Sequence, residues 1–196
     1  MKTFLLVTMF ALAISPVFPA TIDVTAGSGW CTVNDADAQW ITCYNATARY
    51  CRPLKSNDML KAGLGLESKG YKWNIASGGY HGDVSALYLC APIQYVYLTE
   101  YLGLLGTGGI DLAYKLSASQ KGELLGTPLA KDPGYKPFDW GVYASLGYVI
   151  LDKVPVELGM SWGLAEVNDL GHSSVAMKFS LGYRFQTQPT TVALNP

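Results

Sequence analysis

A histidine and a serine two positions apart, His172 and Ser174, are the residues of this sequence best suited to covalent catalysis. A serine esterase needs a base within hydrogen-bond reach of its hydroxyl and a carboxylate that orients the base. No Asp or Glu follows Ser174, so only an upstream carboxylate such as Glu166 or Asp169 is available. We favour the interpretation that His172 belongs to a polar loop, and we expect the protein not to be an enzyme.

The four cysteines are the other reactive residues, and they raise the question of disulfide bonds. Cys31, Cys43 and Cys51 lie close together, whereas Cys90 stands alone inside a strand-like segment. In an exported protein, a disulfide joining Cys31 to Cys43 or Cys43 to Cys51 is compatible with these spacings, with Cys90 as a free thiol. The spacings are irregular and the chain has only two histidines, so we expect no metal site, and no cofactor-binding motif is visible.

The composition and charge bound the class of protein. The chain has 196 residues, of which 49% are hydrophobic and 15% are charged, and its mean hydropathy is +0.17. These values fit a single domain that is more apolar than most soluble ones. A formal net charge of -1 creates no field that would attract nucleic acid, so we expect no nucleic-acid partner. The 13 Tyr, 5 Trp and 21 Gly are residue types typical of strands and membrane interfaces.

Residues 1–20 predict a signal peptide. Lys2 supplies the positive start, and the apolar run at 4–14 is too short to span a bilayer. Cleavage is expected after Ala20, with a later alternative near Ala26. No stretch of about 18 apolar residues follows, so a membrane-spanning mature chain would have to cross as strands.

Alternation of apolar and polar residues between positions 59 and 185 carries the fold prediction. In the clearest segment, 175–185, large apolar residues occupy the odd positions, and small or charged residues occupy the even positions. The same alternation occurs at 60–67, 87–97, 110–117, 138–150 and 154–164. Segments of about ten residues match the length of a tilted membrane-crossing strand. Turn-forming residues separate these strands at 76–83, 126–137, 152–153 and 168–173.

The two faces of these strands favour a membrane barrel over a soluble β-sandwich or a lipocalin-like barrel. One face carries large aliphatic and aromatic residues, and Trp140, Trp162, Tyr95, Tyr97 and Tyr183 are expected near the lipid interfaces. The other face carries Gly, Ser, Ala and charges of both signs, which a narrow barrel can bury as ion pairs. The expected lumen charges are Lys61, Glu67, Lys69, Asp111, Lys115, Asp139, Glu157, Lys178 and Arg184.

The N-terminal segment at 21–58 is harder to interpret. Strands at 21–30 and 39–50 would raise the total to eight, the smallest even number in bacterial barrels of this kind. The polar run at 33–38 and the cysteines can equally form a surface loop or a plug. The prediction is an all-β chain: an antiparallel up-and-down transmembrane β-barrel with its core at 59–185 and a C-terminal tail at 186–196.

Several segments resemble the outer-membrane β-barrel domain family of Bacteroidetes-type bacteria. The matching stretches, in the family's order, are LGLESKGYK at 64–72, LYLCAPIQYVY at 87–97, GGIDLAYKLS at 108–117, FDWGVYASLGY at 138–148, 156–168 and FSLGYRF at 179–185. The resemblance implies the outer membrane of a Gram-negative bacterium, contact with its lipid, and insertion by the barrel-assembly machinery. The strand read by that machinery would carry Phe179, Leu181, Tyr183 and Phe185. The sequence departs from the pattern there, because 186–196 continue past Phe185.

Three functions follow as hypotheses. The first is a structural or surface-interaction protein, with a side-chain-filled lumen and external loops that contact partners or ligands. The second is a narrow, porin-like channel for small solutes. The third is an outer-membrane lipid esterase using His172 and Ser174, whose spacing is similar to that in the lipid A deacylases.

Overall fold

The computed structural model describes residues 20–54, 57–75, 80–99, 104–124, 127–128, 134–167 and 171–186. Positions 1–19 of the predicted signal peptide, 187–196 of the tail and parts of three expected turns lie outside the described residues. In the described part of the chain, no helix is long and apolar enough to cross a membrane.

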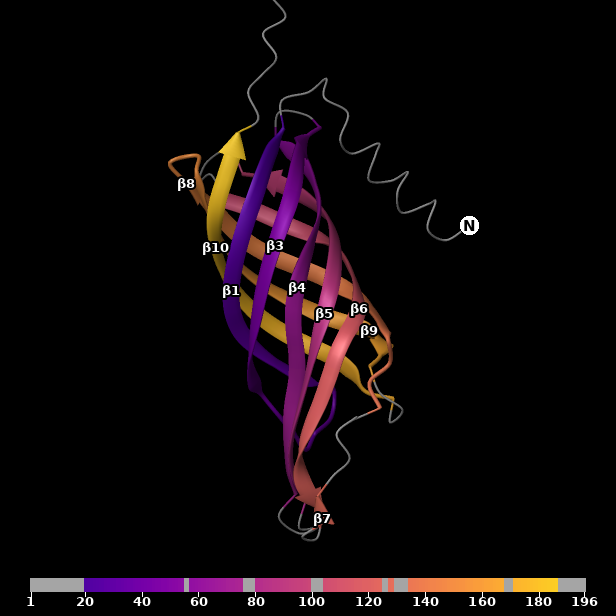
Figure 1. Ribbon diagram of the computed structural model, residues 1–196. Helices are drawn as coiled ribbons and strands as arrows, with labels where there is room; N and C mark the ends of the chain where they lie inside the picture. The colour runs from indigo at the N-terminus through magenta and orange to yellow at the C-terminus, as the bar shows by residue number, and fades with distance from the viewer. Residues whose placement is uncertain are drawn as a thin grey trace, which may run out of the picture.

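Eight long strands form a closed antiparallel barrel (Figure 1). The strands are β1 (Thr21–Val33), β3 (Ile41–Pro53), β4 (Asp58–Ile75), β5 (Tyr80–Leu98), β6 (Leu104–Leu124), β8 (Phe138–Ile150), β9 (Val154–Glu166) and β10 (Ser173–Gln186). The short strands β2 (Ala38–Gln39) and β7 (Thr127–Pro128) pair with β4 and β6. Because β1 pairs with both β3 and β10, the sheet has no free lateral edge along these strands. The predicted eight-stranded barrel is confirmed.

The N-terminal segment belongs to the barrel: of the alternatives left open for 21–58, the structure has the two strands, so the barrel begins at Thr21 and not at residue 59. In β1, Ile22 and Val24 point outward, and Asp23 and Thr25 point into the lumen. The plug alternative is also wrong, because β1 and β3 are needed to join β10 to β4. The polar run between β1 and β2 forms a surface turn in which Asp37 N donates to Asp35 Oδ1 at 2.8 Å.

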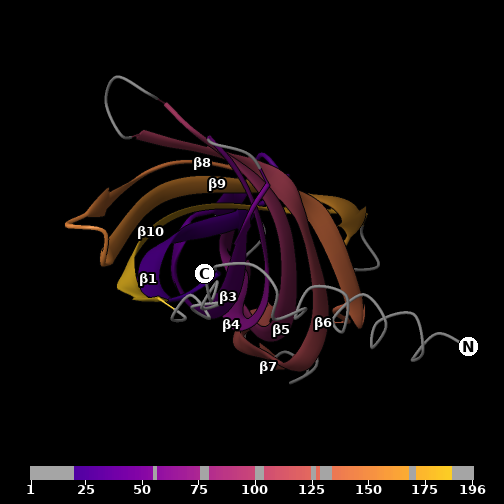
Figure 2. The same cartoon turned by 90° about the horizontal axis from the view of Figure 1, so that it is seen from above.

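The stagger of the barrel follows from its hydrogen-bonded register. The stagger can be followed from Thr21 of β1, by passing at each step to the residue paired with it on the next strand. The residues reached in turn are Cys51, Lys61, Gln94, Gly109, Tyr143, Ser161, Ala176 and then Cys31, which is again on β1. The path therefore returns to β1 at Cys31 rather than at Thr21, which requires strands tilted by about 35–45°. An eight-stranded barrel with this tilt, seen along its axis in Figure 2, has an interior that side chains just fill.

The two ends of the barrel differ. One end, the turn end, carries the start of β1, the end of β10 and the short connections (Figure 1). In its β8–β9 turn, Lys153 N donates to Ile150 O, and the central residues Leu151 and Asp152 have φ of 51° and 59°. These angles define a type I′ turn, placed one residue before the predicted 152–153. The opposite, loop end carries the connections after β1, β4, β6 and β9.

The outward face is apolar and carries aromatic residues near both ends of the strands. Exposed aromatics near the turn end are Tyr95, Tyr97, Tyr148, Tyr183 and Phe185. Those toward the loop end are Trp30, Trp40, Tyr114, Phe138, Trp140 and Trp162. Aliphatic residues such as Leu146 and Leu158 lie between the two groups. This arrangement matches the aromatic girdles that flank the apolar band of membrane barrels.

Three strands extend beyond the barrel at the loop end. Pairing of β3 with β4 stops at Asn45–Glu67, and pairing of β6 with β8 stops at Tyr114–Phe138. Pairing of β4, β5 and β6 with one another continues to the ends of these strands. We call the extension, residues 68–75, 80–87 and 115–124, the projecting sheet (Figure 1).

Beyond Leu87 and Leu116, which are exposed at its base, the outward side chains of the projecting sheet are mostly polar. Lys72 Nζ lies 3.4 Å from Asp83 Oδ1, and Ser85 Oγ lies 3.1 Å from Ser119 Oγ. This polarity explains why the predicted strands at 60–67 and 110–117 were too short. The alternation of large apolar with small residues ends where the strands leave the apolar band.

Candidate functional site

The lumen is lined by equal numbers of acidic and basic side chains. The acidic residues are Asp23, Glu67, Asp111, Asp139 and Glu157, and the basic ones are Arg49, Lys61, Lys69, Lys178 and Arg184. Each buried charge costs several kcal/mol unless it is paired, so the arrangement of the pairs decides whether the lumen is stable.

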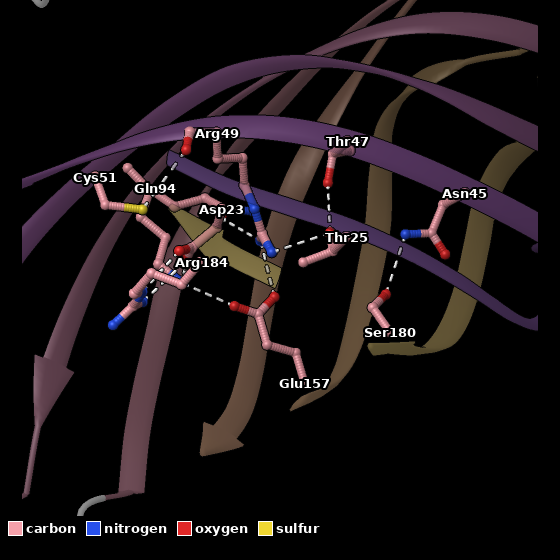
Figure 3. Close-up of polar contacts among 11 residues, drawn as sticks. Asp23, Thr25, Asn45, Thr47, Arg49, Cys51, Gln94, Glu157, Ser180 and Arg184 are labelled. Atoms are coloured by element: carbon pink, nitrogen blue, oxygen red, sulfur yellow. Dashed lines mark hydrogen bonds and ion pairs between the residues drawn. The ribbon is translucent and has the colours of Figure 1, made fainter. Parts of the chain in front are cut away.

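The turn-side cluster, formed by Asp23, Arg49, Lys61, Glu157 and Arg184, fills the lumen nearest the turn end (Figure 3). Arg184 Nε and Nη2 donate to the two carboxylate oxygens of Asp23 at 2.7 and 2.9 Å. Lys61 Nζ and Arg49 Nη1 each lie 2.8 Å from one oxygen of Glu157. Three cations face two carboxylates, so the cluster carries one surplus positive charge.

Two further ion pairs continue the charged lining toward the loop end. Lys178 Nζ lies 2.7 Å from Glu67 Oε1. Lys69 Nζ lies 2.6 Å from Asp139 Oδ2, which also accepts a hydrogen bond from Ser174 Oγ at 3.0 Å. Within the described residues, Asp111 forms no ion pair, and its Oδ1 has no hydrogen-bond partner.

An aromatic and aliphatic cap closes the lumen at the loop end. The buried cap residues are Val33, Tyr71, Val84, Ala86, Tyr88, Tyr135 and Val167. Tyr135, from the segment before β8, stacks on Tyr71 with ring centroids 6.3 Å apart, and burial raises the pKa of its phenol. Lys115 Nζ donates to the backbone oxygen of Tyr135, and Lys136 N donates to Val167 O, which holds this segment in place.

Side chains from three loop-end connections form polar contacts at this end of the barrel. His172 Nε2 lies 2.9 Å from Asp35 Oδ2, and the His172 ring packs edge-on against Trp73 at 5.9 Å. Lys136 Nζ lies 2.7 Å from Glu166 Oε2, and this ammonium group lowers the pKa of Glu166. These contacts join the loop-end connections to one another and to β4 and β9.

The structure gives His172 and Ser174 separate surroundings. The Ser174 hydroxyl donates to Asp139 and is buried in the lumen, while His172 faces Asp35 and Trp73. Of the two carboxylates considered for a triad, Glu166 pairs with Lys136, and Asp169 lies outside the described residues. This arrangement does not provide a serine nucleophile open to lipid. Over the described ranges, no group of three or more His, Cys, Asp or Glu residues is arranged to hold a metal.

All four cysteines are free, so neither of the disulfides considered from the spacings is formed. Cys43 and Cys51 lie on the same extended strand, roughly 26 Å apart at about 3.3 Å per residue. Cys31 and Cys43 pack together, but Cys31 is opposite Ile41 and Cys43 is opposite Gly29. Such diagonal positions have Cα atoms about 7–8 Å apart, beyond the reach of an unstrained disulfide.

The predicted lumen charges are placed as follows. Eight of the nine line the barrel interior, and Lys115 lies at its loop end against Tyr135. Sequence reasoning missed Asp23 and Arg49, although each lies between outward apolar residues. The alternation of outward and inward residues in β1 and β3 could have indicated these two charges. In β3 this alternation is hard to recognise, because the outward positions 46 and 48 carry the small residues Ala46 and Ala48.

Comparisons with known proteins bear on the fold. Neisserial surface protein A is similar with a TM-score of 0.53 at 13% identity, over 84% of this chain and 97% of that one. The attachment invasion locus protein Ail of Yersinia pestis has a TM-score of 0.48 at 12% identity, over 85% and 99%. No family model and no curated protein matches the chain, so the Bacteroidetes-type resemblance stays a prediction. Together with the closed sheet, the likeness to Neisserial surface protein A shows that this chain has the eight-stranded β-barrel fold of bacterial outer-membrane proteins.

Proposed function

We propose that this protein is an outer-membrane barrel with a filled, non-conducting lumen that displays the projecting sheet at the cell surface. The observation that carries the proposal is the filling of the lumen by bonded side chains at both ends. The turn-side cluster occupies one end, and the cap around Tyr135 occupies the other. A solute would have to break buried ion pairs to pass, which favours this function over a narrow channel.

The outward face supports a location in the bilayer. Apolar side chains flanked by aromatic residues would contact outer-membrane lipid along β8, β9 and β10. On β10, Phe179, Leu181, Tyr183 and Phe185 all point outward and form the strand that we expect the barrel-assembly machinery to read. Export would follow from the signal peptide predicted at 1–20.

The projecting sheet is the surface that we expect to meet a partner. Apart from Leu87 and Leu116 at its base, it exposes mainly charged side chains and hydroxyls, such as the Lys72–Asp83 pair and the hydroxyls of Ser85 and Ser119. Exposed carboxylates among the described loop-end residues are Asp37, Asp83, Glu123 and Glu166, and the exposed lysines are Lys72 and Lys121. This balance does not suit a polyanion, so the partner should be a protein or a neutral surface polymer.

Planar-bilayer recording of the refolded protein tests the filled lumen. We expect no discrete conductance steps, because the lumen is blocked by ion pairs and by the cap. Heat-modifiable migration of the same preparation in detergent gels is the control that the barrel has folded. Discrete steps from folded protein would instead support the channel.

Labelling of intact cells with a membrane-impermeant amine reagent tests the orientation. Lys72 and Lys121 in the projecting sheet should react, whereas Lys153 at the turn end should react only after lysis. The reverse pattern would place the projecting sheet in the periplasm and refute its surface role.

A photo-crosslinking amino acid at Ser119, an exposed position of the projecting sheet, tests the interaction itself. On intact cells with their natural surface contacts, we expect adducts that the same substitution at exposed Lys153 does not form. Identical products at both positions, or none at Ser119, would argue against a partner on this sheet.

A lipid esterase is not favoured, because the Ser174 hydroxyl is buried against Asp139. We expect the lipid profile of cells carrying Ser174→Ala to match that of cells carrying the original chain. Loss of a deacylated lipid species would revive the esterase hypothesis.

A further inference from the structure

A small polar cavity lies in the middle of the lumen, beside the turn-side cluster. Its volume is about 30 Å³, and its lining includes Asn45, Arg49, Asp111, Tyr143 and Lys178. Figure 3 shows Arg49 and Asn45 among the polar residues of this region, with Thr25 and Thr47 between them. Most of the residues that line it carry a polar or charged side chain, whereas the cavities that remain dry in proteins are lined by apolar side chains.

Four polar atoms of the lining residues form no hydrogen bond among the described residues, and one of them, Glu67 Oε1, has Lys178 Nζ as an ion-pair partner at 2.7 Å. The other three have no partner of either kind. Arg49 is 4% exposed, and its Nη1 and Nη2 bond to Glu157, Gln94 and Thr25, but its Nε donates to nothing. Asn45 Nδ2 donates to Ser180 Oγ at 3.1 Å, while Asn45 Oδ1 accepts nothing. Asp111 Oδ1 is the third such atom. One buried donor and two buried acceptors therefore line the cavity.

The charges around the cavity are complementary. The turn-side cluster carries one surplus positive charge, and two of its members, Arg49 and Glu157, line the cavity. The Asp111 carboxyl group lines the cavity as well and forms no ion pair among the described residues. Arg49 and Asp111 thus both line the cavity, and each has a buried polar atom without a hydrogen-bond partner there.

We propose that this cavity binds one or two ordered water molecules that bridge Arg49 to Asp111 and Asn45. Water can accept from Arg49 Nε and donate to the two carbonyl-type oxygens, which neither a cation nor an anion can do. A buried water needs about 10–15 Å³ of such space, so the cavity holds at most about two. Arg49 and Lys178 oppose a bare cation, and Asp111 opposes an anion.

The waters would join the two parts of the charged lining without opening a channel. Each would complete hydrogen bonds that no side chain reaches, as buried waters do in other proteins. The inference rests on the cavity alone and stands whether or not the projecting sheet binds a partner.

A crystal structure of the refolded protein, at a resolution that shows ordered solvent, tests the proposal directly. One or two density peaks within hydrogen-bond distance of Arg49 Nε and Asp111 Oδ1 are expected. An empty cavity would overturn the proposal, as would a peak whose anomalous signal identifies a metal or halide ion.

Urea unfolding of lipid-reconstituted variants tests the bridging role. Asp111→Asn keeps an oxygen acceptor, whereas Asp111→Leu fills the space and leaves Arg49 Nε unbonded. We expect the unfolding midpoint to fall in the order original chain, Asp111→Asn, Asp111→Leu. A midpoint for Asp111→Leu equal to or above that of Asp111→Asn would mean a dry cavity and overturn the proposal.

Thr107→Val is the matched control. Thr107 lies on the same strand, is buried and also has an unpartnered hydroxyl within the described structure, but it does not line the cavity. Its midpoint should stay unchanged or rise. A fall equal to that of Asp111→Leu would show that the Asp111 result reports general damage to β6 and not lost water contacts, and would overturn the bridging role.

Discussion

Replacing Lys69 with methionine would leave the Asp139 carboxylate without its cation. Lys69 Nζ lies 2.6 Å from Asp139 Oδ2, and Asp139 has no measurable exposure. Ser174 Oγ would remain as the only donor to that oxygen among the contacts described here. Methionine has a similar length and fits an apolar environment, so the substitution removes the charge more than the packing.

The size of the effect follows from burial. Breaking a buried ion pair by removing one partner costs about 3–5 kcal/mol, because the remaining charge is uncompensated. Exposed pairs contribute only about 0–1 kcal/mol. Lys72, on the same strand, provides the matched control, since its pair with Asp83 spans 3.4 Å and both side chains are at least half exposed.

Urea unfolding in lipid vesicles, followed by tryptophan fluorescence, measures the difference. With slopes of about 1–3 kcal/mol/M, Lys69→Met should lower the midpoint by about 1 M or more. Lys72→Met should leave it nearly unchanged. The double variant Lys69→Met/Asp139→Asn removes the orphaned charge and should recover most of the loss.

Two results would refute the reasoning. Equal midpoints for Lys69→Met and Lys72→Met would mean that water reaches the lumen and screens Asp139. Failure of Asp139→Asn to restore stability would mean that Lys69 contributes through packing, for example against the Tyr88 ring 5.4 Å away, and not through its charge.

Three further comparisons of variants test other parts of the structure by the same unfolding assay. Glu157→Gln should lower the stability more than Lys61→Met. The Glu157 variant leaves three cations facing one carboxylate, whereas the Lys61 variant leaves two cations facing two carboxylates. The opposite order would contradict the charge count of the turn-side cluster. The double variant Leu151→Asn/Asp152→Gly should raise the free energy of unfolding by about 1 kcal/mol, because both positions have positive φ and Asn-Gly suits a type I′ turn. An unchanged free energy of unfolding would show that the turn is not strained. Gly159→Ala should cost about 1–3 kcal/mol, because a Cβ there would lie 2.2 Å from the Tyr143 hydroxyl oxygen. Gly108→Ala, where a Cβ meets nothing within 4 Å, is its control, and equal losses at the two positions would rule out crowding by Tyr143 as the cause.

The sequence alone determined the strands and their faces. Side chains alternate across a strand with a period of two, so Phe179, Leu181 and Tyr183 must share one face, and Lys178 and Ser180 the other. Where both faces had a strong signature, as in β8, β9 and β10, the expected orientation agrees with the structure. The signature weakens in β1 and β3, where small residues occupy the outward face, and two lumen charges were missed there.

Only the tertiary structure decided which charges meet and what closes the lumen. Arg184 bonds to Asp23 across 161 positions of sequence, and Lys61 bonds to Glu157 across 96. The period of two tells which face a residue occupies but not its height along the barrel axis. That height depends on the stagger accumulated over all eight strands, which becomes defined only when β1 pairs with β10. The ion pairs, the cavity beside Arg49 and the position of Tyr135 in the barrel mouth are therefore consequences of closure.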